Sequence, residues 1–157
     1  MAAETGTLAI LLRAIGPATH KLMSMADWRA ASEATGFLAP ETLGNTGNMI
    51  AGFSGDEAEA AARMTAVLRG FGLGENVVPI VRRRGVLEEL VAADPVAQAA
   101  AERVDQTGVY FFAASAPDFG WLADYDGPEK VHVVHGHLVI DFGRDVAKSS
   151  RLMRLVD

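Results

Sequence analysis

The sequence predicts an α+β fold in which short strands alternate with amphipathic helices. Two observations predict this class: apolar runs of strand length recur along the chain, and segments with apolar residues at helical spacing separate them. Half of the 157 residues are hydrophobic and 22% are charged, a composition typical of globular proteins rather than disordered ones.

The first strand and helix are marked by an apolar run and by a capping residue. Residues 7–13 (TLAILLR) are almost all apolar, which predicts a strand buried on both faces. Ser24 precedes an amphipathic stretch and is followed three residues later by Asp27, a pattern close to a capping box. Gly36 is placed to end this helix, because glycine adopts the left-handed conformation that commonly terminates helices.

A hairpin is predicted over residues 41–53. Asparagine and glycine tolerate the positive φ angles of tight turns. Three such residues lie between two short strand-like arms: Asn45, Gly47 and Asn48. The second arm is expected over residues 49–53.

The next helix and strand complete the first half of the chain. Asp56 begins a helix over residues 57–71, and residues 76–82 (NVVPIVR) predict a strand. Pro79 cannot donate a hydrogen bond to a sheet ladder, so this strand is expected at a sheet edge or with a bulge. The order strand, helix, hairpin, helix, strand over residues 1–83 predicts a ferredoxin-like α/β plait (βαββαβ). In such a plait two helices cover one face of a four-stranded antiparallel sheet.

Residues 84–157 predict a second, incomplete plait packed against the first, as a second domain or as part of a single structural domain. After a linking helix over residues 85–93, the strand-like segment GVYFFAA covers residues 108–114. Residues 96–104 suit helix or loop, and residues 117–124 predict a short helix. A tight hairpin around His135-Gly136 is expected over residues 130–142, followed by a terminal helix over residues 145–156. The pattern of the first half repeats, but the closing strand is missing.

Composition and charge exclude several classes of protein. With no cysteine, the chain has no disulfide, thiol nucleophile or thiolate metal site. The net charge of −6 argues against nucleic-acid binding, and the basic run from Arg82 to Arg84 is expected to be neutralised by Glu88 and Glu89. No basic leader is visible, nor an uncharged apolar stretch of about 18 residues, so we expect a cytoplasmic protein without a membrane span.

Several motifs resemble a family of proteins of unknown function, the domain of unknown function family 1697. LLRAIG at residues 11–16 and HKLMSMADWRAASEATGF from His20 are similar to the family's opening strand, loop and first helix. The sequence NTGNMI at residues 45–50 stands where members carry Gln-Ser-Gly-Asn-Val-Val. VAADPV at residues 91–96, followed by the VYFF strand, resembles the family's middle region. The resemblance implies the same two-plait fold and no established activity.

The chain also departs from the family pattern. Ala14 stands where members usually have glycine after Leu-Leu-Arg, and Thr46 replaces a usual serine. Members generally finish with a strand around an Arg-Asn-Trp-Asn-Thr motif, and this chain stops at Asp157 before any such segment. The resemblance therefore implies that the closing strand is absent here or is supplied by a partner.

The strongest candidate site is a group of loop residues expected at one end of the first sheet: Arg13, His20, Lys21, Asn45, Gly47 and Asn48. A guanidinium, an ammonium group and free turn N–H groups that converge there would bind a small anion. The alternative is that Arg13 pairs with a carboxylate, and that Asn48 holds its turn through side-chain-to-backbone hydrogen bonds.

Three histidines of the second hairpin raise a metal-site hypothesis: His132, His135 and His137. Imidazole is a good ligand for zinc or nickel, and Asp141 would reach His137 if the two share a strand face. Side chains alternate along a strand, however, and His135 and His137 flank the turn glycine. We therefore expect an exposed surface hairpin, and no metal or cofactor is predicted.

These observations favour a non-catalytic or regulatory module that binds a small anionic ligand or another protein. The alternative is a small enzyme that uses His20 or a hairpin histidine as an acid/base in a loop pocket. A homodimer joined through a sheet edge is also expected, because an edge left by a missing strand invites pairing.

Overall fold

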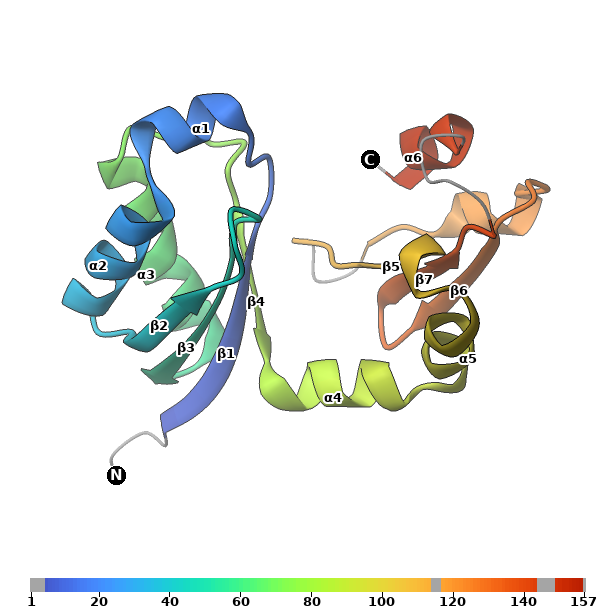
Figure 1. The fold of residues 1–157 in the computed structure, drawn as a ribbon, viewed down its shortest axis with the longest axis horizontal. Coiled ribbons are helices and arrows are strands. Elements are labelled where there is room, and N and C mark those ends of the chain that lie inside the picture. The colour runs from blue at the N-terminus through green and yellow to red at the C-terminus, as the bar shows by residue number, and fades with distance from the viewer. Residues whose placement is uncertain (1–4, 114–116, 144–148, 157) are drawn as a thin grey trace. The chain divides into compact units, whose positions relative to one another are not determined.

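The computed structural model describes residues 5–113, 117–143 and 149–156. The chain divides into two compact units, Met1–Leu87 and Glu88–Asp157, here called the first and second unit. The division falls inside helix α4 (Arg84–Ala92), close to the predicted boundary at residues 83–84. Each unit combines an antiparallel sheet with α-helices, so the chain is an α+β protein, as the sequence predicts (Figure 1).

The first unit contains a four-stranded sheet with the order β2-β3-β1-β4, in which every neighbouring pair is antiparallel. Its strands are β1 (Thr5–Leu12), β2 (Leu38–Thr42), β3 (Asn48–Ser54) and β4 (Pro79–Arg83). Its helices before α4 are α1 (Pro17–Leu22), α2 (Met25–Ala34) and α3 (Glu57–Gly70). β4 is an edge strand and begins at Pro79, which confirms the expectation from the missing proline N–H.

Two side-chain caps fix where the long helices of the first unit begin. The Ser24 hydroxyl accepts a hydrogen bond of 3.0 Å from the Asp27 N–H at the start of α2. The Asp56 carboxylate accepts one of 2.7 Å from the Glu59 N–H at the start of α3. Each cap satisfies an N–H that has no partner within the helix, so both starts were predictable from local sequence. Gly36 has φ 102°, as its predicted role after α2 requires.

The core of the first unit lies between the sheet and helices α2 and α3, which run along one face of the sheet (Figure 1). Side chains alternate along β1, so Leu8, Ile10 and Leu12 face the helices and are buried. Trp28 of α2 is fully buried, and its indole N–H lies 3.1 Å from the Met64 sulfur of α3. The face turned away from α2 and α3 is called the outer face of the first sheet.

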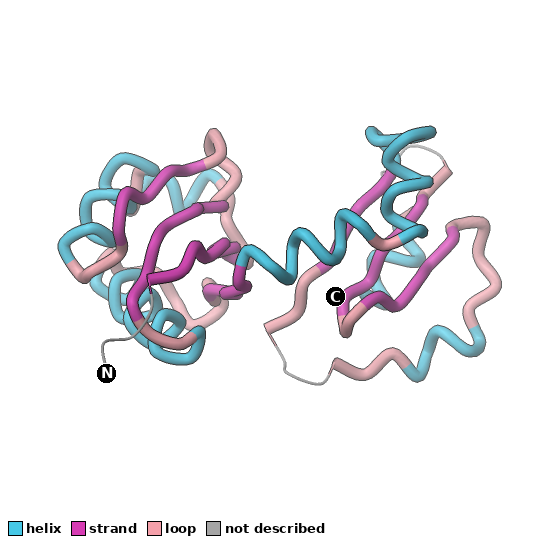
Figure 2. The backbone as a smooth tube through the Cα atoms, turned by 90° about the horizontal axis from the view of Figure 1, so that it is seen from below, coloured by secondary structure: helices cyan, strands magenta, loops and turns pink. Residues whose placement is uncertain are grey.

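The second unit contains a three-stranded antiparallel sheet within the described ranges, with the order β5-β7-β6. The strands are β5 (Thr107–Tyr110), β6 (Lys130–Val134) and β7 (His137–Asp141), and they run side by side in Figure 2. Its helical elements after α4 are α5 (Asp94–Arg103), η1 (Val104–Gln106), η2 (Gly120–Asp124) and α6 (Ser150–Val156). None of the helices in the described ranges is long and apolar enough to cross a membrane.

Some boundaries in the second unit differ from the sequence-based expectation. The strand predicted over residues 108–114 spans Thr107–Tyr110 instead, and its last residue, Tyr110, lies opposite Leu138 of β7. Residue 114 lies outside the described residues, as do residues 145–148 of the predicted terminal helix. The stretch that suited helix or loop is mostly helical, since α5 covers Asp94–Arg103.

The core of the second unit lies on the β7 face that carries Leu138, Ile140 and Phe142, together with Leu152 of α6. Aromatic side chains that are only partly buried complete this cluster: Tyr110, Phe112, Phe119, Trp121 and Tyr125. The second core therefore depends on side chains that remain partly accessible to solvent.

Candidate functional site

The C-terminal end of β1 is held between two loops of the first unit. The N–H of Leu12 donates a hydrogen bond of 2.9 Å to the carbonyl of Gly47, in the turn between β2 and β3. The N–H of Arg13 donates one of 3.0 Å to the carbonyl of Val78, just before β4. The backbone of Arg13 is therefore fixed where β1 ends, at one end of the sheet, while its side chain is exposed.

The β2–β3 turn is held by backbone hydrogen bonds and by Thr46. The N–H and the hydroxyl of Thr46 both donate to the Leu43 carbonyl, at 3.2 and 2.6 Å, and the Leu43 N–H donates to the Asn48 carbonyl at 3.0 Å. The side-chain amide of Asn48 forms no hydrogen bond with any other described residue. The alternative in which the Asn48 side chain holds the turn is therefore wrong, because Thr46 has that role.

Gly47 brings the turn against the loop that follows β1. It has φ 76°, and a Cβ atom built on it would lie 2.7 Å from Cγ1 of Ile15. Such a separation is too short for two carbon atoms, so only glycine permits this approach. Sequence reasoning missed Ile15, although an isolated apolar residue in a loop next to glycine and proline is the signal that could have found it.

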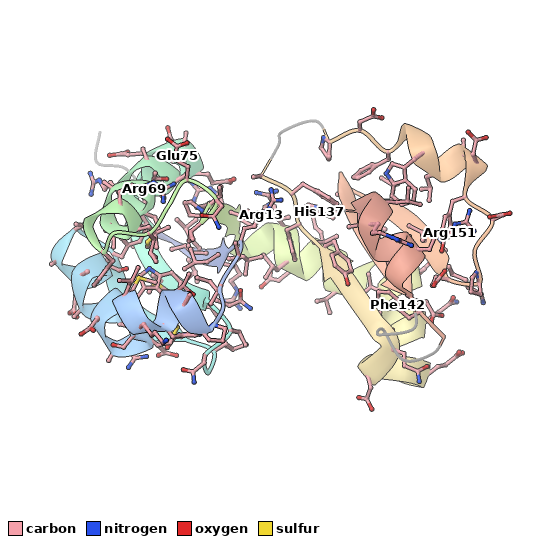
Figure 3. The ribbon with its side chains drawn as sticks, turned by 90° about the horizontal axis from the view of Figure 1, so that it is seen from above. Arg13, Arg69, Glu75, His137, Phe142 and Arg151 are labelled. Atoms are coloured by element: carbon pink, nitrogen blue, oxygen red, sulfur yellow. The ribbon has the colours of Figure 1, made fainter. Side chains whose placement is uncertain are left out.

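Arg13 and Asn48 lie at the same end of the sheet. Asn48 is the register partner of Leu11, two residues before Arg13. Because Met49 and Leu12 face the helices, alternation places Asn48 and Leu11 on the outer face. Figure 3 shows Arg13 on the side of the first unit that is turned away from its helices. The structure thus brings together Arg13, Gly47 and Asn48, with Asn45 at the exposed tip of the turn.

His20 and Lys21 belong to a different element of the first unit. Both belong to the six-residue helix α1, which begins after Gly16 and is fixed by hydrogen bonds between Thr19 and Gly16. Lys21 is exposed and His20 is half-buried. Within the described ranges, neither side chain forms a hydrogen bond or ion pair, so no contact joins them to Arg13 or to the turn.

The Arg13 guanidinium likewise forms no ion pair or hydrogen bond with another described residue. The alternative in which Arg13 pairs with a protein carboxylate is therefore wrong for the described part of the chain. An exposed guanidinium at a fixed backbone position, beside a turn stabilised by other groups, can accept an oxyanion without first giving up a protein partner.

In the basic run from Arg82 to Arg84, Arg83 differs from the expectation. Arg83 lies 3.4 Å from the Glu57 carboxylate of α3 and donates to the Gly55 carbonyl at 3.0 Å, so its partner is neither Glu88 nor Glu89. Burial lowers the pKa of Arg82, and attraction to Glu57 only partly offsets this effect. Arg82 and Arg83, the first two arginines of this run, thus contribute to the fold of the first unit.

The three histidines of the second hairpin differ in burial. His132 and His135 are exposed, but His137 is only 5% exposed, so the expectation that it lies exposed in the turn is wrong. His137 starts the central strand β7, its Nδ1 lies 3.3 Å from the Val134 carbonyl, and its ring packs edge-on against Phe111 at 4.9 Å. Side chains point out of the faces of a sheet, so the burial comes from what packs on that face: the Phe111 ring lies against His137, and helix α5 contacts β7.

Asp141 shares the strand face of His137, four residues along β7, and is also buried. One of its oxygens accepts a hydrogen bond of 3.1 Å from the Gly143 N–H. Among the described residues, no three histidine, aspartate or glutamate side chains come together as a possible metal site.

The family model described as protein of unknown function (DUF1697) matches residues 6–138. The chain belongs to this family. Ala14 has φ 63°, a left-handed conformation in which glycine is favoured, so the glycine that members usually carry there has a physical reason.

Among the solved structures that resemble this chain is one that aligns with most of its length. It is described as the structure of conserved bacterial protein SP0830 from Streptococcus pneumoniae, and it aligns with a TM-score of 0.71 over 94% of this chain and 82% of that chain. The two sequences are 15% identical, so the likeness concerns the fold alone. A search of curated proteins returned no match to this chain.

Proposed function

We propose that this protein is a binding module for small anions, with an oxyanion group such as phosphate recognised at the end of the first sheet. The observation that carries the proposal is the Arg13 guanidinium, exposed and without a protein partner in the described ranges, beside the β2–β3 turn. The ligand-contacting residues would be Arg13, Asn45, Gly47 and Asn48, with His20 and Lys21 of α1 as further polar groups.

The chemistry of these groups suits a small oxyanion. Arginine presents a planar fork of N–H donors that matches two oxygens of a phosphate or carboxylate. The Asn48 side-chain amide, free of protein hydrogen bonds in the described part of the chain, adds a neutral donor on the same side of the sheet. A hydrogen bond to a charged group contributes about 1.5–3 kcal/mol, so Arg13 is expected to dominate the affinity.

A small ligand fits this region better than a nucleic acid. Nucleic-acid binding depends on many cationic contacts, whereas the net charge here is −6 and the local group supplies only the cations Arg13 and Lys21. RNA-binding plaits also stack bases on exposed aromatic residues of the sheet. Phe53, the aromatic residue of β3, is fully buried against the helices instead.

Binding is favoured over catalysis because the histidine at this site is not oriented. A general base is normally held in position by a second group. The His20 ring forms no hydrogen bond with any described residue, so nothing fixes its tautomer or direction. We therefore place the enzyme hypothesis second.

We also propose that the first unit is a ferredoxin-like plait and the second an incomplete one. The strand order β2-β3-β1-β4 and the two helices on one face support the first assignment. The order β5-β7-β6 supports the second, because it corresponds to β1-β3-β2 of the first unit, and the described residues of the second unit contain no equivalent of β4. If a second copy of the chain pairs with this sheet, β5 is the edge at which we expect it.

The anion proposal is tested by titrating the protein with inorganic pyrophosphate at constant ionic strength, with amide shifts followed by NMR. We expect saturable shifts at Arg13 and in the β2–β3 turn. Arg13→Gln should weaken binding by about tenfold or more, the loss expected for one charge-assisted hydrogen bond.

The matched control is Arg154→Gln, which removes the same charge from an exposed position of α6 in the second unit. It should bind pyrophosphate as the natural protein does. Equal affinity of the Arg13→Gln variant and the natural protein would refute the site, as would an absence of saturable shifts in the turn.

The homodimer is tested separately by light scattering coupled to size-exclusion chromatography. A dimeric mass that becomes monomeric when a β5 residue is replaced by proline, for example Val109→Pro, would support pairing at this edge, because proline removes a ladder N–H. A monomeric mass at working concentration would contradict it.

A further inference from the structure

The second unit contains a pocket that the anion site does not explain. Its volume is about 210 Å³, and it lies between the chain around η2, strand β7 and helix α6. The side chains that matter for its chemistry are Phe112, Asp118, Phe119, Trp121, Leu138 and Leu155. All of them belong to the second unit, so the pocket is a feature of that unit alone.

The aromatic walls of this pocket are held by contacts within the protein. Phe112 and Phe119 pack edge to face, with ring centroids 5.4 Å apart. Trp121 makes a similar contact with Tyr125, at 5.9 Å. Such pairs are favourable beyond the area they bury, so the rings are positioned before any ligand arrives. The rings are nevertheless only partly buried, which leaves part of each available to a ligand.

Asp118 gives the pocket a negative charge. One carboxylate oxygen accepts a hydrogen bond of 2.8 Å from the Gly120 N–H, which fixes the direction of the group. Its other oxygen forms no hydrogen bond or ion pair with a described residue. Arg151, a cation of α6, is paired with Asp126 at 3.0 Å and lies over the Tyr125 ring, so its charge is already engaged.

The volume limits the size of the ligand. A cavity of about 150 Å³ lined by apolar side chains can hold benzene. A pocket of about 210 Å³ is therefore large enough for one aromatic ring with a short side chain, and too small for most drug-sized molecules, which need about 300 Å³ or more.

We propose that this pocket binds a small primary amine that carries one aromatic ring. The ring packs among Phe112, Phe119, Trp121 and Leu138, and the ammonium group lies against the free oxygen of Asp118. The apolar walls select the ring by burying it, and the carboxylate selects the positive charge. This site is independent of the anion site, because it lies in the other unit and prefers a ligand of opposite charge.

The two tryptophans make the proposal measurable with an internal control. Trp28 is fully buried in the first unit, and Trp121 lines the pocket. In a titration with phenethylamine followed by NMR, we expect the indole N–H signal of Trp121 to shift in a saturable way while that of Trp28 stays in place. Trp121→Phe assigns the two signals.

Three reference ligands test the chemistry. Ethylamine lacks the ring, ethylbenzene lacks the charge, and 3-phenylpropionate carries the opposite charge. Each should bind at least about tenfold more weakly than phenethylamine, which corresponds to about 1.4 kcal/mol. Equal binding of 3-phenylpropionate would overturn the assignment of Asp118, and equal binding of ethylamine would overturn the assignment of the ring.

Two variants locate the site. Asp118→Asn removes the charge and keeps an acceptor for the Gly120 N–H, so it should weaken phenethylamine binding about fivefold or more without weakening ethylbenzene binding. Leu155→Ser removes part of an apolar wall and should also weaken binding, whereas Leu22→Ser, at an exposed leucine of α1, should not. Unchanged affinity in both pocket variants, or no shift of the Trp121 signal in the natural protein, would refute the proposal.

Discussion

The two units place their large aromatic side chains differently. In the first unit Trp28, Phe37 and Phe53 are fully buried, and the two phenylalanine rings stack at 4.9 Å. In the second unit the corresponding cluster, which includes Phe112, Phe119 and Trp121, is only partly buried. Aromatic residues thus contribute mainly to the buried core in the first unit, and in the second they also line the pocket around Trp121.

The elements that carry the rings explain this difference. In the first unit Trp28 lies on α2 and Phe53 on β3, and both belong to the core between the helices and the sheet. In the second unit Trp121 belongs to the five-residue helix η2 and Phe119 is its N-cap residue. These two rings pack against the core residues of β7 and are only partly buried themselves. Burial of an aromatic residue therefore depends on the elements that cover it.

The largest expected effect tests this comparison directly. Trp28→Ala removes a fully buried indole and should lower the free energy of unfolding by about 3–5 kcal/mol. Trp121→Ala should cost less than half as much, because its side chain is only partly buried. Urea denaturation followed by circular dichroism measures both. Equal losses would contradict the difference in cover between the units.

A second prediction concerns the close contact between the loop after β1 and the β2–β3 turn of the first unit. Gly47→Ala should cost about 1–3 kcal/mol, because its φ of 76° is strained for alanine and the new Cβ would clash with Ile15. The control is Gly70→Ala at the end of α3, where an added Cβ has no neighbour within 4 Å. Thermal unfolding measures the stability of both variants. A Gly47→Ala variant as stable as Gly70→Ala would show that the turn and the loop after β1 are not tightly packed.

A third, smaller effect is expected at Ala14. Its φ of 63° is unfavourable for a residue with a Cβ atom, by about 1–2 kcal/mol. Glycine removes this strain but loses more chain entropy on folding, by about 0.4–1 kcal/mol. Ala14→Gly should therefore raise the free energy of unfolding of the first unit by roughly 0.5–1 kcal/mol, as measured by urea denaturation. A destabilised variant would mean that the alanine side chain makes a favourable contact.

The smallest expected effect lies in the second unit and depends on pH. Partial burial raises the pKa of Tyr110 above 10.0, because the charged phenolate is less well solvated there. The folded state then holds the phenol proton more tightly than the unfolded chain does. Stability from this group is complete below pH 10 and falls as the pH rises through the folded pKa.

This prediction is checked by measuring unfolding of the second unit between about pH 9 and pH 11, values that span the usual tyrosine range. Tyr110→Phe, which cannot ionise, should lose less stability over that interval than the natural protein. Identical pH profiles would contradict the effect of burial on Tyr110.

Local features of the sequence predicted much of the fold. Ser24 and Asp56 act as caps because a cap involves residues only three positions apart. Pro79 identified an edge strand because the missing N–H is a property of the residue itself. The position of Arg13 after β1 and that of the glycine turn between β2 and β3 were also predictable, because the ends of strand-like runs mark both places.

Features that depend on distant partners were not predictable. The pairing of Arg83 with Glu57 joins residues far apart in sequence, and nearby Glu88 was the natural choice from spacing alone. The burial of His137 depends on Phe111 of a distant segment and on helix α5 packed against β7, which no local pattern reveals. The same holds for the pocket around Trp121, whose walls come from four separate segments of the chain.

The way the two units are joined has a practical consequence. β4 ends at Arg83 and α4 begins at Arg84, so no loop residue separates them, and the division between the units falls within α4. Proteases cut chain that can leave regular structure and extend into their active sites. Cleavage between Leu87 and Glu88 therefore requires that α4 first unwind, so limited digestion should spare this junction and cut preferentially in exposed loops elsewhere.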